Sequence, residues 1–330
     1  HETLGEMAQL GAWSDYVEKH LLPRIFGFEL LMAPYTVAHM KLSILLQETG
    51  YGFARGQRLG IYLTNTLEEA ITQAETLGFA GFISEEGNAA AEIKRDKPIM
   101  VVLGNPPYAG HSANRSWEIR DGKRVRNFIG KLVRDYYRVD GKPLGERNPK
   151  WLQDDYVKFI RWGQWRIQRT GAGILAFITN HGYLDNPTFR GMRQSLMQTF
   201  DDIYIVDLHG DARKQERCPD GSRDQNVFDI LPGVAISIFV RSPAAGGRRG
   251  RVQHAHLWGL REVSEEMPSG DRALSSGKYH WLWEHHMATT DWAPIEPRSP
   301  FYLFVPQDTE LLEEYQGTWS VRDAMPVCSL

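Results

Sequence analysis

Five apolar residues, Ile99 to Leu103, are followed by Gly104 and then by the tetrapeptide Asn105-Pro106-Pro107-Tyr108. The apolar run has the length and composition of a strand that is buried on both faces. Because proline cannot continue a strand ladder, the strand must end here and a loop must begin. The sequence therefore predicts polar and aromatic side chains at the carboxyl end of a buried strand, where α/β folds bind their ligands.

Strand and helix patterns alternate through much of the chain. Periodicity predicts helices at residues 3–20, 34–48, 151–169 and 187–200, and strands at 24–29, 61–63, 173–179, 203–208, 234–240 and 251–258. This alternation predicts an α/β fold with a mostly parallel sheet and helices on both faces. The strands at 234–240 and 251–258, separated by a Gly/Arg-rich segment, are expected to form a closing antiparallel pair.

The composition is that of an ordinary globular protein, with 42% hydrophobic and 24% charged residues. No apolar run approaches the roughly 20 residues that cross a bilayer, and the first residues lack an export signal, so we expect a cytoplasmic protein without a membrane partner. The two cysteines, Cys218 and Cys328, are far apart and support neither a disulfide framework nor a zinc site. The length of 330 residues predicts one large and one smaller domain, with a boundary near residue 260, where the periodicity ends.

The tetrapeptide can hold an amino group attached to an aromatic ring. The lone pair of such a nitrogen is delocalised into the ring, so a catalyst must hold both amino hydrogens and leave the lone pair facing the group donor. Asn105 offers its side-chain oxygen and Pro106 its backbone carbonyl, while the rigid Pro106-Pro107 pair fixes their directions. Tyr108 can stack on a base that is turned out of a duplex. The alternative is a simple turn, because asparagine and proline are common in turns.

These residues resemble the amino-group (N6-adenine) DNA methyltransferases that carry an Asn-Pro-Pro-Tyr motif. Two further segments, Phe177 to Arg190 and Ile205 to Gly210, resemble the methyltransferase region of single-polypeptide type I restriction-modification enzymes. The resemblance implies an S-adenosylmethionine-dependent methyltransferase fold, with a Rossmann-like mixed sheet, over residues 1–260. It also implies that residues 261–330 begin a target-recognition domain that reads duplex DNA.

The resemblance assigns the catalytic role to Asn105, Pro106, Pro107 and Tyr108, and further roles to three residues elsewhere. Glu29 resembles the acid that binds the ribose hydroxyls of S-adenosylmethionine, and Asn65 resembles the polar residue that contacts the cofactor's adenine. Phe228 resembles the aromatic residue that supports the flipped base from the other side. The residues by themselves also allow a solvated acid at position 29, a turn residue at 65 and a core residue at 228.

The glycine-rich first motif of the family, which wraps the methionine part of the cofactor, should precede the helix at residues 3–20 and does not appear. The resemblance therefore implies a fragment of a larger polypeptide. The parent would also carry an ATP-driven helicase and a nuclease, whose motifs do not occur in these 330 residues.

The net charge of −3 gives no global basic footprint, so DNA contact must rely on local clusters. Such clusters can hold phosphates, although a solvated surface is the usual explanation of a charge run. The basic groups are Arg115, Arg120, Lys123, Arg124, Arg126, Lys131 and Arg134, and then Arg241, Arg248, Arg249 and Arg251.

Two histidine pairs, His254 with His256 and His285 with His286, have the residue type of metal ligands. No carboxylate or cysteine cluster completes either pair in the sequence, so no metal site is expected.

Two rivals to a DNA adenine methyltransferase remain open. One is a methyltransferase acting on a protein glutamine or on RNA, because the tetrapeptide can hold any planar amide or amino group. The other is a non-catalytic DNA-binding module. The long excursion at residues 109–150 and the region after residue 260 favour a large duplex target.

Overall fold

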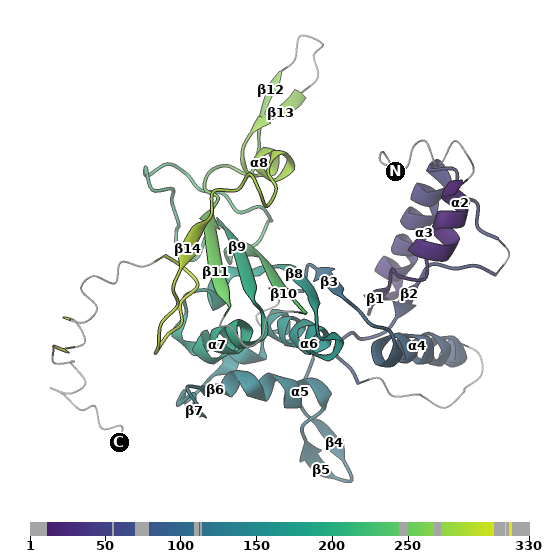
Figure 1. Cartoon of the computed structure of the whole chain (residues 1–330), viewed down its shortest axis with the longest axis horizontal. Helices are drawn as coiled ribbons and strands as arrows, with labels where there is room; N and C mark the ends of the chain where they lie inside the picture. The colour runs from purple at the N-terminus through teal and green to yellow at the C-terminus, as the bar shows by residue number, and fades with distance from the viewer. Residues whose placement is uncertain are drawn as a thin grey trace. The chain divides into compact units, whose positions relative to one another are not determined.

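The computed structural model describes residues 12–54, 56–69, 79–108, 112, 114–243, 250–266, 272–306, 314 and 317–318. The chain divides into two compact units (Figure 1). Unit 1 comprises residues 1–99 and 114–132, and unit 2 comprises residues 100–113 and 133–330. The excursion after the tetrapeptide therefore contributes to both units.

Unit 1 is built around a short parallel strand pair that packs against helices. Its elements are α2 (Ala12–Tyr16), the π-helical turn η2 (Val17–Leu21), β1 (Gly27–Glu29), α3 (Met32–Glu48), β2 (Ile61–Leu63), α4 (Phe79–Asp96), β4 (Glu118–Arg120), β5 (Lys123–Val125) and α5 (Phe128–Leu132). Trp13, Val17, Leu46 and Ile61 belong to its buried core. The strands predicted at 24–29 and 61–63 and the helix predicted at 34–48 are confirmed, while the first part of the helix predicted at 3–20 lies outside the described residues.

Unit 2 contains the larger sheet. Its elements are β3 (Val101–Gly104), η3 (Val133–Tyr137), β6 (Arg138–Val139), β7 (Lys142–Pro143), η4 (Lys150–Gln153), α6 (Asp155–Thr170), β8 (Gly173–Asn180), η5 (His181–Tyr183), η6 (Pro187–Phe189), α7 (Arg190–Thr199), β9 (Asp202–His209), β10 (Val234–Arg241), β11 (Arg251–His256), β12 (Val263–Glu266), β13 (Arg272–Ser276), α8 (Lys278–Glu284) and β14 (Ala293–Ile295).

The six-stranded sheet of unit 2 has the order β14-β11-β9-β10-β8-β3. Strands β3, β8, β9 and β11 run in one direction, and β10 and β14 run in the other. The expected mixed α/β fold is therefore confirmed. The carboxyl ends of the four parallel strands lie on the same side of the sheet. The tetrapeptide follows β3 on that side.

The predicted antiparallel pairing of residues 234–240 with 251–258 is wrong. Strand β9 lies between β10 and β11, and β11 pairs with β9 in parallel. This order gives β9 a hydrogen-bonded neighbour on each side, which satisfies its backbone groups in the interior of the sheet.

Strand β3 is not buried on both faces, as its apolar sequence predicted. Among the described residues it pairs with β8 alone, at the edge of the sheet. Val101 is 54% exposed and Leu103 is 75% exposed. An apolar run indicates that a segment favours an extended backbone and burial. Whether it is buried depends on which elements pack against the strand.

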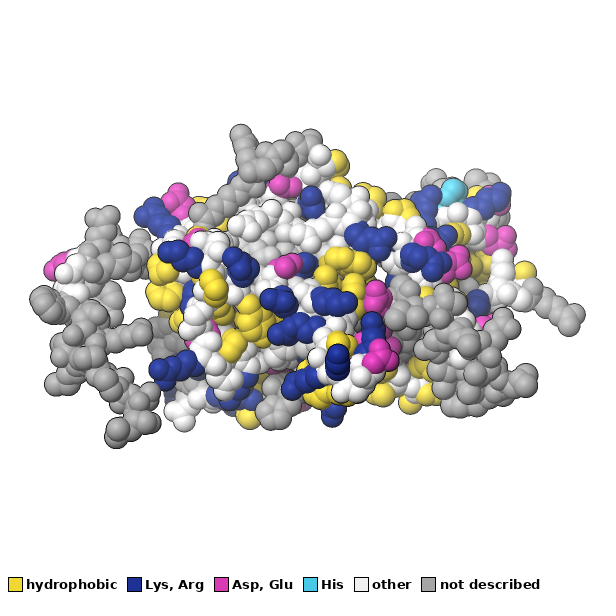
Figure 2. Space-filling model, turned by 90° about the horizontal axis from the view of Figure 1, so that it is seen from below, with side chains coloured by type: hydrophobic (Ala, Val, Ile, Leu, Met, Phe, Trp, Pro, Cys, Tyr) yellow, Lys and Arg dark blue, Asp and Glu magenta, His cyan; other side chains and the backbone are white. Residues whose placement is uncertain are grey.

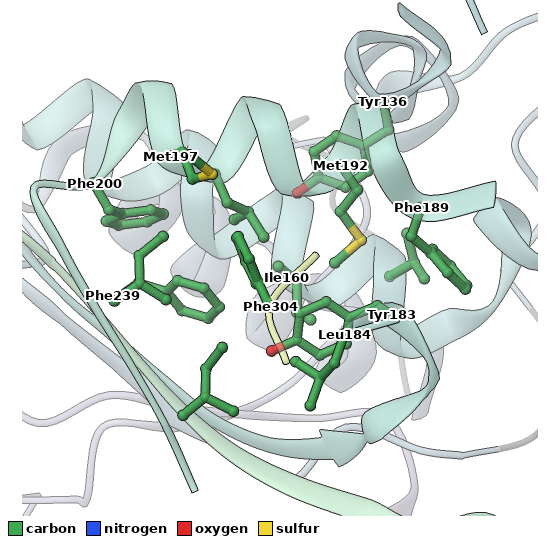
Figure 3. Close-up of a cluster of buried hydrophobic side chains, with 14 of the residues drawn as sticks. Tyr136, Ile160, Tyr183, Leu184, Phe189, Met192, Met197, Phe200, Phe239 and Phe304 are labelled. Atoms are coloured by element: carbon green, nitrogen blue, oxygen red, sulfur yellow. The ribbon is translucent and has the colours of Figure 1, made fainter. Parts of the chain in front are cut away.

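The two faces of the sheet in unit 2 have separate apolar clusters. Helices α6 and α7 cover one face, where Phe200, Phe239 and Phe304 belong to the main core (Figure 3). On the other face Val206, Leu208 and Val227 form a second cluster, against which Trp281 of α8 packs. Residues after position 260 thus contribute to unit 2, and the predicted domain boundary at that position stays a prediction.

Within the described part of the chain, no helix has the length and apolar character needed to span a bilayer.

Candidate functional site

The tetrapeptide begins directly after β3, on the side of the sheet where the parallel strands have their carboxyl ends. Asn105 and Pro107 are exposed, Pro106 is buried and Tyr108 is half-buried. The Tyr108 hydroxyl lies within hydrogen-bond distance of Asn105 Oδ1, and it is also 3.0 Å from the carbonyl oxygen of Ile178 on β8. Burial raises the pKa of Tyr108 above its ordinary value, so the hydroxyl stays protonated and donates.

Phe228 lies across from Tyr108. The two ring centroids are 6.1 Å apart, and the ring planes are inclined by 34°. A base inserted between two aromatic rings needs about 7 Å between them, because each stacked contact takes about 3.5 Å. The observed pair therefore leaves too little room for a base, and one ring must move outward before a base can enter.

Asn226 fixes the backbone that carries Phe228. Its side-chain nitrogen donates to the carbonyl oxygens of Gly210 at 3.1 Å and Pro232 at 2.8 Å, and its Oδ1 accepts the Phe228 amide at 2.8 Å. The amide thus joins both ends of the segment between β9 and β10. The spacing of Asn226 and Phe228 is that of an Asx turn, a signal in the sequence that could have found this residue.

A buried ion pair holds the same segment from α8. Lys278 Nζ lies 2.8 Å from Asp224 Oδ1, and both side chains are fully buried. Lys278 also donates to the carbonyl oxygens of Leu208 and Gln225, at 2.6 and 2.7 Å. No sequence pattern indicated this contact, since a lysine in a polar stretch is ordinarily at the surface.

Replacement of Asn226 by alanine is expected to lower the free energy of unfolding by about 2 kcal/mol, because it leaves buried carbonyl groups and the Phe228 amide without their partner. Urea unfolding measures the change. Asn226→Asp, which keeps the acceptor but loses both donors, should also destabilise the protein. Equal stability of all three proteins would contradict this role for the Asn226 amide.

Glu29 and Asn65 lie in unit 1, at the same end of the parallel pair β1 and β2. Glu29 is half-buried, and its Oε1 accepts the Leu31 amide at 2.9 Å. Asn65 Oδ1 accepts the Leu67 amide at 3.0 Å, and Asn65 Nδ2 donates to Asn114 Oδ1 at 2.8 Å. The structure thus shows Asn65 as a turn residue, and its contact with a cofactor stays a prediction, as does that of Glu29.

The predicted basic groups differ in their local contacts. Arg120 pairs with Glu118 at 2.6 Å, and Arg251 pairs with Asp202 at 2.7 Å. The guanidinium of Arg124 lies over the Trp117 ring at 3.8 Å. Arg248 and Arg249 lie outside the described residues. Figure 2 shows Lys and Arg side chains at many places on the surface in view, with acidic side chains beside some of them.

No protein-family model matches this chain, and no curated protein matches it. Solved structures do. The chain is similar to the ATP-dependent Type ISP restriction-modification enzyme LlaBIII bound to DNA, with a TM-score of 0.60 and 24% identity over 78% of this chain and 16% of that one.

Two further structures have the same fold. A nuclease-deletion mutant of the Type ISP enzyme LlaGI, in complex with a DNA substrate mimic, gives a TM-score of 0.66 and 22% identity over 94% of this chain and 24% of that one. A DrdV–DNA complex gives a TM-score of 0.62 and 22% identity over 93% of this chain and 27% of that one. The chain therefore shares a fold with part of these proteins and spans less than a third of their length. The shared fold agrees with the fold that the resemblance in the sequence implied.

Proposed function

We propose that this chain is the methyltransferase part of a restriction-modification enzyme, and that it transfers a methyl group from S-adenosylmethionine to the amino nitrogen of an adenine turned out of duplex DNA. The observation that supports this most is the pairing of the Asn105–Tyr108 loop, at the carboxyl end of β3, with the Phe228 ring across from Tyr108. The likeness in fold to Type ISP restriction-modification enzymes also supports the proposal.

In the proposed reaction Asn105 Oδ1 and the Pro106 carbonyl oxygen accept hydrogen bonds from the two amino N–H groups, which leaves the nitrogen lone pair facing the methyl donor. The Tyr108 hydroxyl must leave Asn105 Oδ1 when the base enters. The Ile178 carbonyl, 3.0 Å from that hydroxyl, offers it a second acceptor. Tyr108 can thus exchange partners without leaving a buried donor unsatisfied.

The residues of unit 1 fit the cofactor in part. The half-buried Glu29 carboxylate at the end of β1 suits a pair of ribose hydroxyls, and its contact with the Leu31 amide fixes its direction. The Asn65 amide suits the edge of an adenine ring only after it exchanges its bond with Asn114. S-adenosylmethionine, when bound, supplies a sulfonium methyl that is already activated.

We infer that the substrate is duplex DNA, that residues 261–330 begin the region that reads its sequence, and that the parent polypeptide also carries helicase and nuclease regions. LlaBIII is an ATP-dependent Type ISP restriction-modification enzyme whose structure was solved bound to DNA. The LlaGI structure is that of a nuclease-deletion mutant in complex with a DNA substrate mimic. The exposed basic side chains supply contacts that phosphates can use.

The test is transfer of tritiated methyl from S-adenosylmethionine by the full-length parent, offered unmethylated duplex DNA of varied sequence, structured RNA or glutamine peptides. Digestion of the labelled product identifies the modified base or residue. Label in adenine of duplex DNA supports the proposal. Label confined to RNA or peptide, or absence of label from a folded protein that binds the cofactor, contradicts it.

A further inference from the structure

A cluster of histidine and acidic side chains lies at the carboxyl ends of β9 and β11, among residues with no part in the proposed reaction. These strands are parallel neighbours, and His256 pairs with Asp207 in their register. Strand residues two apart point to the same face, so His254 accompanies His256. The His209 ring at the end of β9 stacks with the His256 ring at a centroid distance of 5.0 Å. The fold therefore brings a carboxylate to the histidine pair that lacked one in the sequence.

Three ring nitrogens of this cluster face one another. His256 Nδ1 is 2.8 Å from His209 Nε2 and 3.4 Å from His254 Nε2. On the far side of each ring, His254 Nδ1 is 2.9 Å from the Phe304 carbonyl oxygen, and His209 Nδ1 is 3.1 Å from a Glu216 carboxylate oxygen. A carbonyl and a carboxylate only accept, so each Nδ1 is assigned the proton. When the rings are neutral, at most one proton, on His256, is left for three facing nitrogens.

A metal cation would accept the facing lone pairs of these rings, because neutral imidazole is the form that binds metals.

The distances suit a metal cation. Ligand atoms of Asp207, His254 and His256 all lie within 4.8 Å of one another. The 3.4 Å between His254 Nε2 and His256 Nδ1 matches the ligand spacing of about 3.4 Å around a tetrahedral ion with bonds of about 2.1 Å. The 2.8 Å between His209 and His256 is shorter, so these rings must separate slightly around an ion.

The contacts behind the cluster are those that orient metal-binding histidines. A ligand histidine ordinarily donates its second ring nitrogen to a carbonyl or a carboxylate, as His254 does to Phe304 and as His209 does to Glu216. His256 is the exposed member and gives an ion access from solvent. His209 has a φ of 52°, a left-handed backbone conformation that non-glycine residues rarely adopt and that is enriched at functional sites.

We propose that Asp207, His254 and His256 bind one divalent transition-metal ion of the zinc type, and that His209, beside His256, becomes the fourth ligand after a small shift of its ring. Imidazole and carboxylate ligands suit zinc, and a set of four protein ligands is typical of structural zinc sites. The ion joins β9 to β11. Through Glu216 it also holds the segment that leads from β9 to Phe228.

The experiment measures zinc binding by the purified full-length protein, without a histidine tag and stripped of metal, in competition with a chromophoric chelator. We expect one tight site per chain. His256→Ala, which removes an exposed ligand, should weaken binding by at least about 100-fold, and Glu216→Gln should weaken it by about 10-fold. His285→Ala, which removes an exposed histidine outside the cluster, is the matched control and should leave the affinity unchanged.

Cobalt provides a second measurement, because a four-coordinate cobalt site has a strong visible absorption. The wild-type protein and the His285→Ala variant should show this absorption, and the folded His256→Ala variant should lose it. Should His256→Ala fail to fold, the near-isosteric Glu216→Gln carries the comparison. Absence of a micromolar zinc site in the wild-type protein, or equal affinity in the wild type and both cluster variants, overturns the proposal.

Discussion

Asn105→Ala is expected to lower kcat for methyl transfer to DNA by about 10²–10³-fold, the usual effect of removing one positioned hydrogen-bonding group from a reacting centre. The change removes Asn105 Oδ1, one of the two acceptors that would hold the adenine amino group. Its effect should fall on kcat more than on KM, because the proposed base stacking by Tyr108 and Phe228 and the proposed phosphate contacts remain. Single-turnover transfer of tritiated methyl measures the change directly.

Two variants of Tyr108 separate its ring from its hydroxyl. Tyr108→Phe keeps the stacking surface and releases Asn105 Oδ1 from the bond it now accepts, so its kcat should stay within about tenfold of wild type. Tyr108→Ala removes the surface that faces Phe228 and should weaken base binding by about 1–3 kcal/mol.

Asn148→Ala is the matched control for Asn105→Ala, because Asn148 is also an exposed asparagine that precedes a proline. It should transfer methyl as the wild type does. Transfer by a folded Asn105→Ala protein at the wild-type rate would contradict the catalytic role of the tetrapeptide and favour a simple turn.

Local sequence patterns predicted most of the strands and helices that position this site. The strand at 61–63 is observed with the predicted bounds, and those at 173–179 and 203–208 are each one or two residues longer than predicted. Periodicity reports which face of an element is apolar, and that information is local. The turn chemistry of Pro106 and Pro107 likewise sufficed to end β3 where it does.

Local sequence patterns do not predict which strands pair with each other in the sheet. Neither β10 nor β11 carries a signal that β9 separates them, because an interior strand is compatible with several neighbours. The same limit explains why the sequence predicted no metal site at the histidines. His254 and His256 are two residues apart in the sequence, whereas Asp207 comes close to them only through the parallel pairing of β9 with β11. The exposure of β3 depends in turn on what packs beside it.

Lys278→Met is expected to lower the free energy of unfolding by about 3–5 kcal/mol, because it leaves the Asp224 carboxylate buried without its counter-ion. Asp224 has few other ways to be satisfied: its Oδ1 accepts the Gly259 amide at 2.8 Å, and its Oδ2 is buried without a hydrogen-bond partner. The loss also releases the Leu208 and Gln225 carbonyls that Lys278 binds. Chemical denaturation of the wild-type and variant proteins measures the effect.

A double-mutant cycle distinguishes the ion pair from simple loss of packing. The double variant Lys278→Met with Asp224→Asn removes both charges, so it should be destabilised by less than the sum of the two single variants. Lys214→Met is the matched control, since its partner Asp185 is 3.5 Å away and both side chains are about half exposed; it should change stability by less than about 1 kcal/mol. Strict additivity of the two single changes would show that Lys278 and Asp224 act independently. In that case Asn226 and its neighbours, rather than the ion pair, would hold the segment that carries Phe228.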